Sequence, residues 1–189
     1  MEACDEFYIN QTLYDGRPAD LTNRLEKEIR TYDLLDQLGI PFQRLDHDPL
    51  PTIDACREVD SLLDIEICKN LFLCNAPKTD FYLLLLPGKK KFRTAVLSKQ
   101  IGSARLSFAT PDYMNQYLNI TPGSVSVLGL MNDKDNKVQL LIDEEVLTYE
   151  YFGCHPCINT SSLKLKTTDL IDRILPAVNH TFTLVNLPD

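Results

Sequence analysis

The run Ile65-Glu-Ile-Cys-Lys-Asn-Leu-Phe-Leu-Cys-Asn75 is followed, five residues later, by Phe81-Tyr-Leu-Leu-Leu-Leu-Pro87. Both runs have the length of a strand and are apolar enough to be largely buried. The connector Ala76-Pro-Lys-Thr-Asp80 supplies the proline and aspartate that tight turns favour. The two runs are therefore predicted to form an antiparallel hairpin at the centre of the fold.

Helix and strand patterns flank this hairpin without a regular alternation. Apolar residues recur every three or four positions over 21–38, which predicts a helix that Gly39 and Pro41 end. Further helices are expected over 52–58 (capped by Thr52), 95–101, 112–118 and 168–177 (capped by Thr168). Strands are expected over 42–47, 106–109, 148–152, 162–166 and 182–185, and at the end of 121–130, with a hairpin turn at 132–136 returning as a strand over 138–142.

This pattern predicts an α+β fold: a single domain with a mixed, mostly antiparallel sheet and flanking helices. Residues 1–20 lack clear periodicity and are interpreted as an extended arm, which leaves 21–189 for the domain. The chain has 189 residues, of which 44% are hydrophobic, so it can build a full core. No apolar run of about 18 residues predicts a membrane span, and the acidic N-terminus does not resemble a signal peptide, so we expect a cytoplasmic protein.

Charge is distributed unevenly along the chain. A net charge of −8 argues against a general nucleic-acid coat, yet residues 87–105 carry six of the 19 basic residues and no acid. These six are Lys89, Lys90, Lys91, Arg93, Lys99 and Arg105. The stretch can follow a phosphate backbone, or it can be a solubilising loop after an apolar strand, and the sequence leaves both readings open.

The Cys154-His155-Pro156-Cys157 segment resembles a redox or metal motif. A redox cysteine needs a helix N-terminus to lower its thiol pKa, but a turn and a strand are expected here. A structural zinc ion needs four ligands, and no second Cys or His pair has suitable spacing. We therefore expect His155-Pro156 to carry any function. The other cysteines are predicted to be buried (Cys56, Cys68 and Cys74) or in a mobile tail (Cys4).

Two further features have both a structural and a functional reading. Lys69 and Asn70 interrupt an apolar strand, where a lysine needs water, an acid or a ligand anion such as phosphate. It can equally be the solvent-facing lysine of an edge strand. The loop Pro122-Gly-Ser-Val-Ser126 can present backbone N–H groups to a carbonyl oxygen or phosphate, although most such loops are simple turns.

Taken in order, these segments resemble the YbaK/ProX family of aminoacyl-tRNA deacylases, and within it the free-standing prolyl-tRNA deacylase branch. That branch is related to the editing insertion domain of bacterial prolyl-tRNA synthetases. The matching stretches are 34–42, 47–49, 69–73, 81–88, 105–109, 121–126, His155-Pro156 and Asn159-Thr160, and the resemblance covers about residues 28–187. One departure is Val127, which stands where the family usually has proline.

The resemblance implies a hydrolase that cleaves the ester between a wrong amino acid and a tRNA, here alanine on proline tRNA, without metal or cofactor. It marks Lys69, His155 and Gly123 as catalytic, with Lys69 holding the terminal phosphate or adenosine and His155 contacting substrate or positioning water. It implies substrate binding by Asn70, Ser124, Val125, Ser126, Val127, Asn159 and Thr160.

Contact with the tRNA backbone would fall to Lys89, Lys90, Lys91 and Arg93, and the resemblance also suggests transient contact with prolyl-tRNA synthetase. Two alternatives stay open. One is a non-catalytic tRNA-binding homologue, motivated by Val127. The other is a thiol redox protein that uses Cys154 and Cys157.

Overall fold

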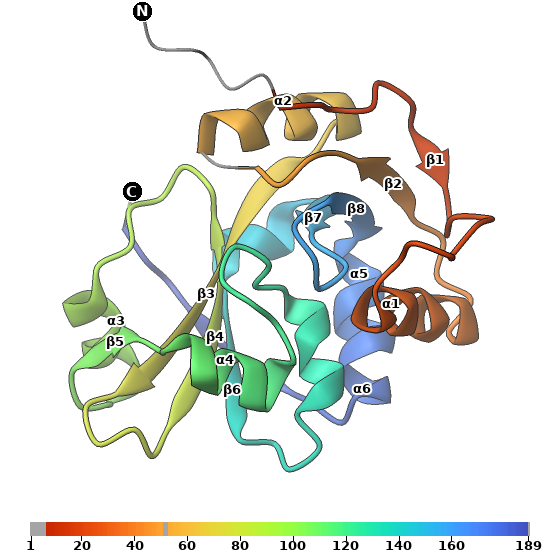
Figure 1. The fold of residues 1–189 in the computed structure, drawn as a ribbon. Helices are drawn as coiled ribbons and strands as arrows, with labels where there is room; N and C mark the ends of the chain where they lie inside the picture. Colours follow the sequence, from red (N-terminus) through yellow and green to blue (C-terminus); the bar gives the residue numbers. More distant parts are fainter. Residues whose placement is uncertain (1–6, 51–52, 189) are drawn as a thin grey trace, which may run out of the picture.

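The computed structural model describes residues 7–50 and 53–188. Within this part of the chain nine strands form a sheet in the order β1-β2-β8-β7-β3-β4-β6-β9, and β5 pairs with β3 (Figure 1). The strands are β1 Tyr14–Asp15, β2 Gln43–Asp46, β3 Glu66–Asn75, β4 Phe81–Pro87, β5 Leu106–Phe108, β6 Val138–Asp143, β7 Tyr151–Cys154, β8 Ser161–Lys166 and β9 Phe182–Val185. The helices are α1 Glu26–Gln37, α2 Ile53–Leu63, α3 Thr94–Ile101, α4 Pro111–Leu118, α5 Thr167–Asp169 and α6 Leu175–Ala177, with η1 Val127–Asn132, η2 Glu144–Thr148 and η3 Leu170–Ile174.

The β3–β4 hairpin is present as predicted and joins the two halves of the sheet. β3 pairs antiparallel with β4 along most of its length, with Lys69 opposite Leu86. Its first residues instead pair parallel with β7. Five strand pairs among the described residues are antiparallel and three are parallel. The predicted α+β class, with a mixed and mostly antiparallel sheet, is therefore confirmed.

The predicted strand after residue 121 and the hairpin turn at 132–136 are wrong. Residues 127–132 form the 3-10 helix η1, whose first turn is fixed by the Ser126 hydroxyl accepting from the Leu128 N–H at 3.2 Å. β6 then pairs parallel with β4, so it is not the return strand of a hairpin. A short buried apolar run has no periodicity that separates a strand from a helix, which explains the error.

Several helices and strands also begin or end at residues other than those predicted. α1 begins at Glu26, not at residue 21, because the Asp20 carboxylate accepts from the Thr22 N–H and holds a turn there. η2 occupies 144–148, so β7 starts at Tyr151. The last helical run starts at Thr167 without a side-chain cap, so Thr168 is not its cap. α2 continues to Leu63, and the predicted cap Thr52 lies outside the described residues.

Part of the predicted N-terminal arm joins the sheet. β1 pairs antiparallel with β2, and Ile9 forms an isolated bridge with His47. The arm therefore packs along the edge of the sheet that carries β2.

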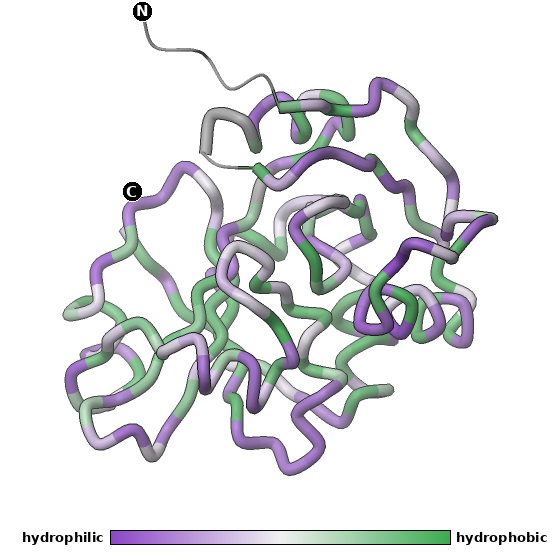
Figure 2. Tube along the Cα trace, viewed as in Figure 1, coloured by the Kyte–Doolittle hydropathy of each residue, from purple (hydrophilic) through white to green (hydrophobic). Residues whose placement is uncertain are grey.

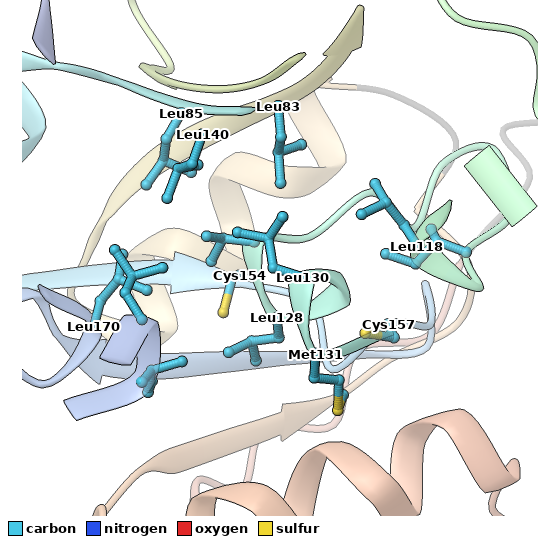
Figure 3. Packing of buried hydrophobic residues seen from close by; sticks show 14 of the residues in the cluster. Leu83, Leu85, Leu118, Leu128, Leu130, Met131, Leu140, Cys154, Cys157 and Leu170 are labelled. Carbon is cyan, nitrogen blue, oxygen red and sulfur yellow. The ribbon is translucent and has the colours of Figure 1, made fainter. Parts of the chain in front are cut away.

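The main core lies between the sheet and the helices. Figure 3 shows Leu128, Leu130 and Met131 of η1 packed beside Cys154 and Cys157. In Figure 2 the hydrophobic colour follows the central strands, whereas α1 and several turns are largely hydrophilic. No helix in the described ranges is long and apolar enough to cross a bilayer.

α2 covers a smaller cluster of its own. Val59 and Leu63 pack there against Ile9 and Leu45. Figure 1 shows α2 lying across one end of β3, beside β2.

Candidate active site

A pocket of about 270 Å³ opens between α2, the middle of β3, the 121–127 loop and the end of β7. Its wall is mainly apolar, and its polar side chains are Asp60, Lys69, Asn70, His155 and Ser162. The volume suits a small organic group and is below that of most drug-sized sites. An apolar cavity with a few converging polar groups is the usual form of a binding or catalytic site.

Lys69 lies in the wall of this pocket, on β3. Its ammonium donates a hydrogen bond to the backbone carbonyl of Lys90 at 2.8 Å. That bond uses one of the three N–H donors of the lysine, and the other two can serve a ligand. The cation in the apolar strand therefore faces a pocket, as the functional reading of Lys69 requires.

Asn70, the next residue of β3, holds the 121–127 loop in place. Its side-chain oxygen accepts from the Val127 N–H at 2.9 Å, and its amide donates to the Cys68 carbonyl at 3.1 Å. No described group accepts a hydrogen bond from the backbone N–H of Val125 or Ser126. Val125 lines the pocket, so its backbone N–H is a donor available at the wall, whereas Ser126 is fully buried and lies outside the wall.

Gly123 is required at its position by both backbone and neighbours. Its φ is +85°, a conformation that other residues rarely adopt. A Cβ there would lie 3.2 Å from the side-chain nitrogen of Asn159. Asn159 in turn accepts from the Leu50 N–H at 3.4 Å, so this side chain links the loop to the segment before α2.

Two histidines meet at the β7–β8 end of the pocket. His155 Nδ1 donates to the Ser161 carbonyl at 2.8 Å, which leaves Nε2 as the hydrogen-bond acceptor of the neutral ring. Burial lowers the pKa of His155 to about 4, so the ring is neutral at pH 7. Ser162 lies within 2.9 Å of His47 Nε2 and 3.5 Å of His155 Nδ1, so its hydroxyl connects the two rings.

Asp60 of α2 was not singled out from the sequence, yet it lines the same pocket. No described residue donates a hydrogen bond to its carboxyl group. Burial, with the nearby charge of Glu66, raises the pKa of Asp60 to about 7. Strongly shifted carboxyl groups in clefts are common at functional sites.

The cysteines near the pocket have the properties of structural residues. Cys68, Cys74, Cys154 and Cys157 are buried free thiols, whereas Cys56 is half-buried, not buried as predicted. Burial raises the pKa of Cys157 to about 11 and also raises the pKa of Cys154, the reverse of what a redox thiol needs. No group of three or more His, Cys, Asp or Glu residues in the described ranges could hold a metal ion. Cys4 lies outside those ranges.

The basic stretch divides into buried and exposed residues. Lys90 is buried, and its ammonium binds Asp143 at 3.0 Å and the Leu187 carbonyl at 2.9 Å. The prediction that Lys90 contacts tRNA is therefore corrected, because this ammonium is withdrawn from solvent. Lys91 and Arg93 are exposed, and Lys89 is exposed while ion-paired with Glu145.

The structure thus brings some of the predicted site residues together and leaves others outside. Lys69, Asn70, Gly123, Val125 and His155 line one pocket. The remaining predicted substrate-binding residues, Ser124, Ser126, Val127, Asn159 and Thr160, are not part of its wall. Val127 is buried in the core, so its side chain does not face a substrate.

Comparison with known proteins gives the family of the chain. A family model described as "Aminoacyl-tRNA editing domain" matches residues 47–173. The chain is an aminoacyl-tRNA editing domain and belongs to that family, the YbaK/ProX family.

Its relatives include the "Prolyl-tRNA editing protein ProX" of Acetoanaerobium sticklandii, 33% identical over 81% of this chain and 93% of that protein. They also include the "Prolyl-tRNA synthetase associated domain-containing protein 1" of Mus musculus, 27% identical over 80% of this chain and 91% of that protein. A solved structure provisionally named a trans-editing enzyme for prolyl tRNA synthetase has the same fold. Its TM-score is 0.63 at 16% identity, and the match covers 87% of this chain and 98% of that one.

Proposed function

We propose that this protein is a trans-editing deacylase that removes alanine from mischarged proline tRNA. The observation that carries the proposal is the pocket in which Lys69, Gly123 and His155 converge within an aminoacyl-tRNA editing domain. The ProX relative, a prolyl-tRNA editing protein by name, supports proline tRNA as the acceptor. The proposed reaction takes place in the cytoplasm, where transient contact with prolyl-tRNA synthetase would deliver the substrate.

The chemistry asked of the pocket is modest, because an aminoacyl ester is already reactive. Lys69 would bind a phosphate oxygen of the terminal nucleotide with its two available N–H donors. The backbone N–H of Val125 would stabilise the oxyanion that forms when water attacks the ester carbonyl. His155 Nε2 would accept a hydrogen bond from that water or from the ribose 2′-hydroxyl.

The proposed reaction would add a second step of selection by size after aminoacylation. A synthetase site shaped for proline cannot strongly reject the smaller alanine, since missing methylenes are worth only about 1–3 kcal/mol. A second site can reject proline by steric clash, because close-packed walls resist deformation. In this protein the wall that excludes proline would be the apolar side of the pocket, to which Gly123 and Val125 contribute.

The test is hydrolysis of alanyl-tRNA prepared on proline tRNA, compared with spontaneous hydrolysis in the same buffer. Wild-type protein is expected to release alanine, and Lys69→Ala to lose about 10- to 150-fold in kcat/KM, the value of a charge-assisted contact. Lys134→Ala, an exposed lysine in the turn before β6, is the matched control and should be fully active. If wild-type protein releases no alanine above the spontaneous rate, the proposal fails and a non-catalytic tRNA-binding role is favoured.

A further inference from the structure

The charges in the pocket have opposite signs. Among the described residues in its wall, Lys69 and Asp60 are the only ones with a Lys, Arg, Asp or Glu side chain. His155 and the thiols of Cys56, Cys68 and Cys154 are kept neutral at pH 7, because burial lowers the pKa of the histidine and raises those of the thiols. At neutral pH the pocket therefore offers one cation and one carboxyl group.

The carboxyl group of Asp60 has no partner in the described protein, and its surroundings are unfavourable to a negative charge. Glu66 on β3 places a second negative charge near Asp60. The polar neighbours of Asp60 are the thiols of Cys56 on α2 and Cys68 on β3. Burying an unpaired charge is costly, so such a group either takes up a proton or binds an ion of opposite sign. An unpaired carboxyl group in a ligand pocket is thus suited to a cationic ligand group.

An aminoacyl ester carries one such group, its free α-amine, next to the carbonyl that is attacked. We propose that the Asp60 carboxylate binds the α-ammonium group of the aminoacyl moiety, a role that rests on the proposed function. Lys69 and Asp60 then bind the two charged parts of the substrate, the phosphate and the ammonium, with the ester between them. Such a pair would fix the orientation of the ester toward the 121–127 loop.

This role makes Asp60 a residue that recognises the amine, and it predicts discrimination between alanyl-tRNA and lactyl-tRNA. Lactate has a hydroxyl in place of the amine of alanine and is otherwise nearly the same size. The rate of each ester is divided by its spontaneous rate, because the two differ in intrinsic reactivity. Wild-type protein should prefer alanyl-tRNA by about 10-fold or more.

Asp60→Asn should lower the rate of hydrolysis of alanyl-tRNA by about 10-fold or more, and it should change the rate with lactyl-tRNA by less than about twofold. Glu58→Gln, an exposed carboxyl group on the same helix, is the matched control and should leave both rates unchanged. If Asp60→Asn lowers the hydrolysis rates of both esters equally, Asp60 supports the structure or transfers a proton, and the inference is wrong. If it lowers neither, the inference is also wrong.

A binding measurement separates this inference from the proposed function. Adenosine carrying an alanylamide at the 3′ position cannot be hydrolysed as an ester, and its lactylamide lacks the amine. Asp60→Asn should weaken binding of the alanylamide about 10-fold and leave the lactylamide unchanged, whether or not the wild type hydrolyses alanyl-tRNA. Equal affinities of wild-type protein for the two amides, or no binding of either, would overturn the inference.

Discussion

Gly123 shows how one residue can be required by both its own backbone and its neighbour. Gly123→Ala places a side chain at a φ of +85° and 3.2 Å from Asn159. Gly102 has a φ of +65° with nothing within 4 Å, so Gly102→Ala tests the backbone cost alone. Denaturant unfolding should show a loss of about 1–2 kcal/mol for each variant. Only Gly123→Ala should lower kcat/KM, by about 10-fold. Equal kcat/KM values for Gly123→Ala and Gly102→Ala would show that the contact with Asn159 has no role in activity.

Asp60 gives the pH dependence of stability a definite sign. Its pKa rises from 3.8 to about 7 on folding, so between these values the folded chain holds a proton that the unfolded chain releases. This contribution to stability is present below about pH 4 and is lost as the pH rises through 7. Asp60→Asn cannot ionise, so its Tm relative to wild type should increase from pH 4 to pH 8. A constant difference in Tm over this range would mean that the Asp60 carboxyl is not buried as described.

One hydrogen bond joins β3 to the 121–127 loop, from the Val127 N–H to the side-chain oxygen of Asn70, and a substitution at either residue can remove it. Asn70→Ala removes the acceptor, and Val127→Pro removes the donor, because proline has no N–H. Ser126 is extended (φ −147°, ψ 142°) and Val127 opens η1, so the backbone should accept proline there. Each variant should lose about 1 kcal/mol of stability for this bond.

Because both changes remove the same bond, their effects should not add. The double variant is expected to be about as stable as Asn70→Ala, which also lacks the bond to the Cys68 carbonyl. Strict additivity of the two unfolding free energies would show that the bond contributes nothing. Proline at 127, usual in the family this chain resembles, would thus cost a contact here and not simply stiffen the loop.

The β3–β4 hairpin and the α+β class could be predicted because they depend on local signals, namely apolar runs and turn residues. The parallel pairing of β6 could not be predicted, because it depends on contacts between distant segments. The 3-10 turn at 127–132 could not be predicted either, because a short buried apolar run has no periodicity that separates a strand from a helix. Lys69 stood out as a charge in an apolar strand. Asp60 did not, since it is one of 27 acidic residues and becomes special only where α2 packs over the sheet.

The charge of the whole molecule bears on how it would bind tRNA. The net charge is −8, so attraction has to come from a local surface, and Lys91 and Arg93 are exposed on the segment that leads away from the pocket. A Lys91→Ala/Arg93→Ala variant should flatten the log–log salt dependence of tRNA affinity by about 0.7–0.9 for each lost phosphate contact. A Lys134→Ala/Lys137→Ala variant, with both changes in an exposed turn, should keep the wild-type slope. Identical slopes for the two double variants would mark the basic stretch as solvated surface.

The central claim is that the pocket removes alanine and refuses proline on the same tRNA. The most direct measurement is the ratio of kcat/KM for alanyl and prolyl esters of proline tRNA with wild-type protein. We predict a ratio above about 200, because a packed wall excludes the larger ring by more than missing contacts can discriminate. A ratio near one would contradict the account and would indicate a deacylase without size selection.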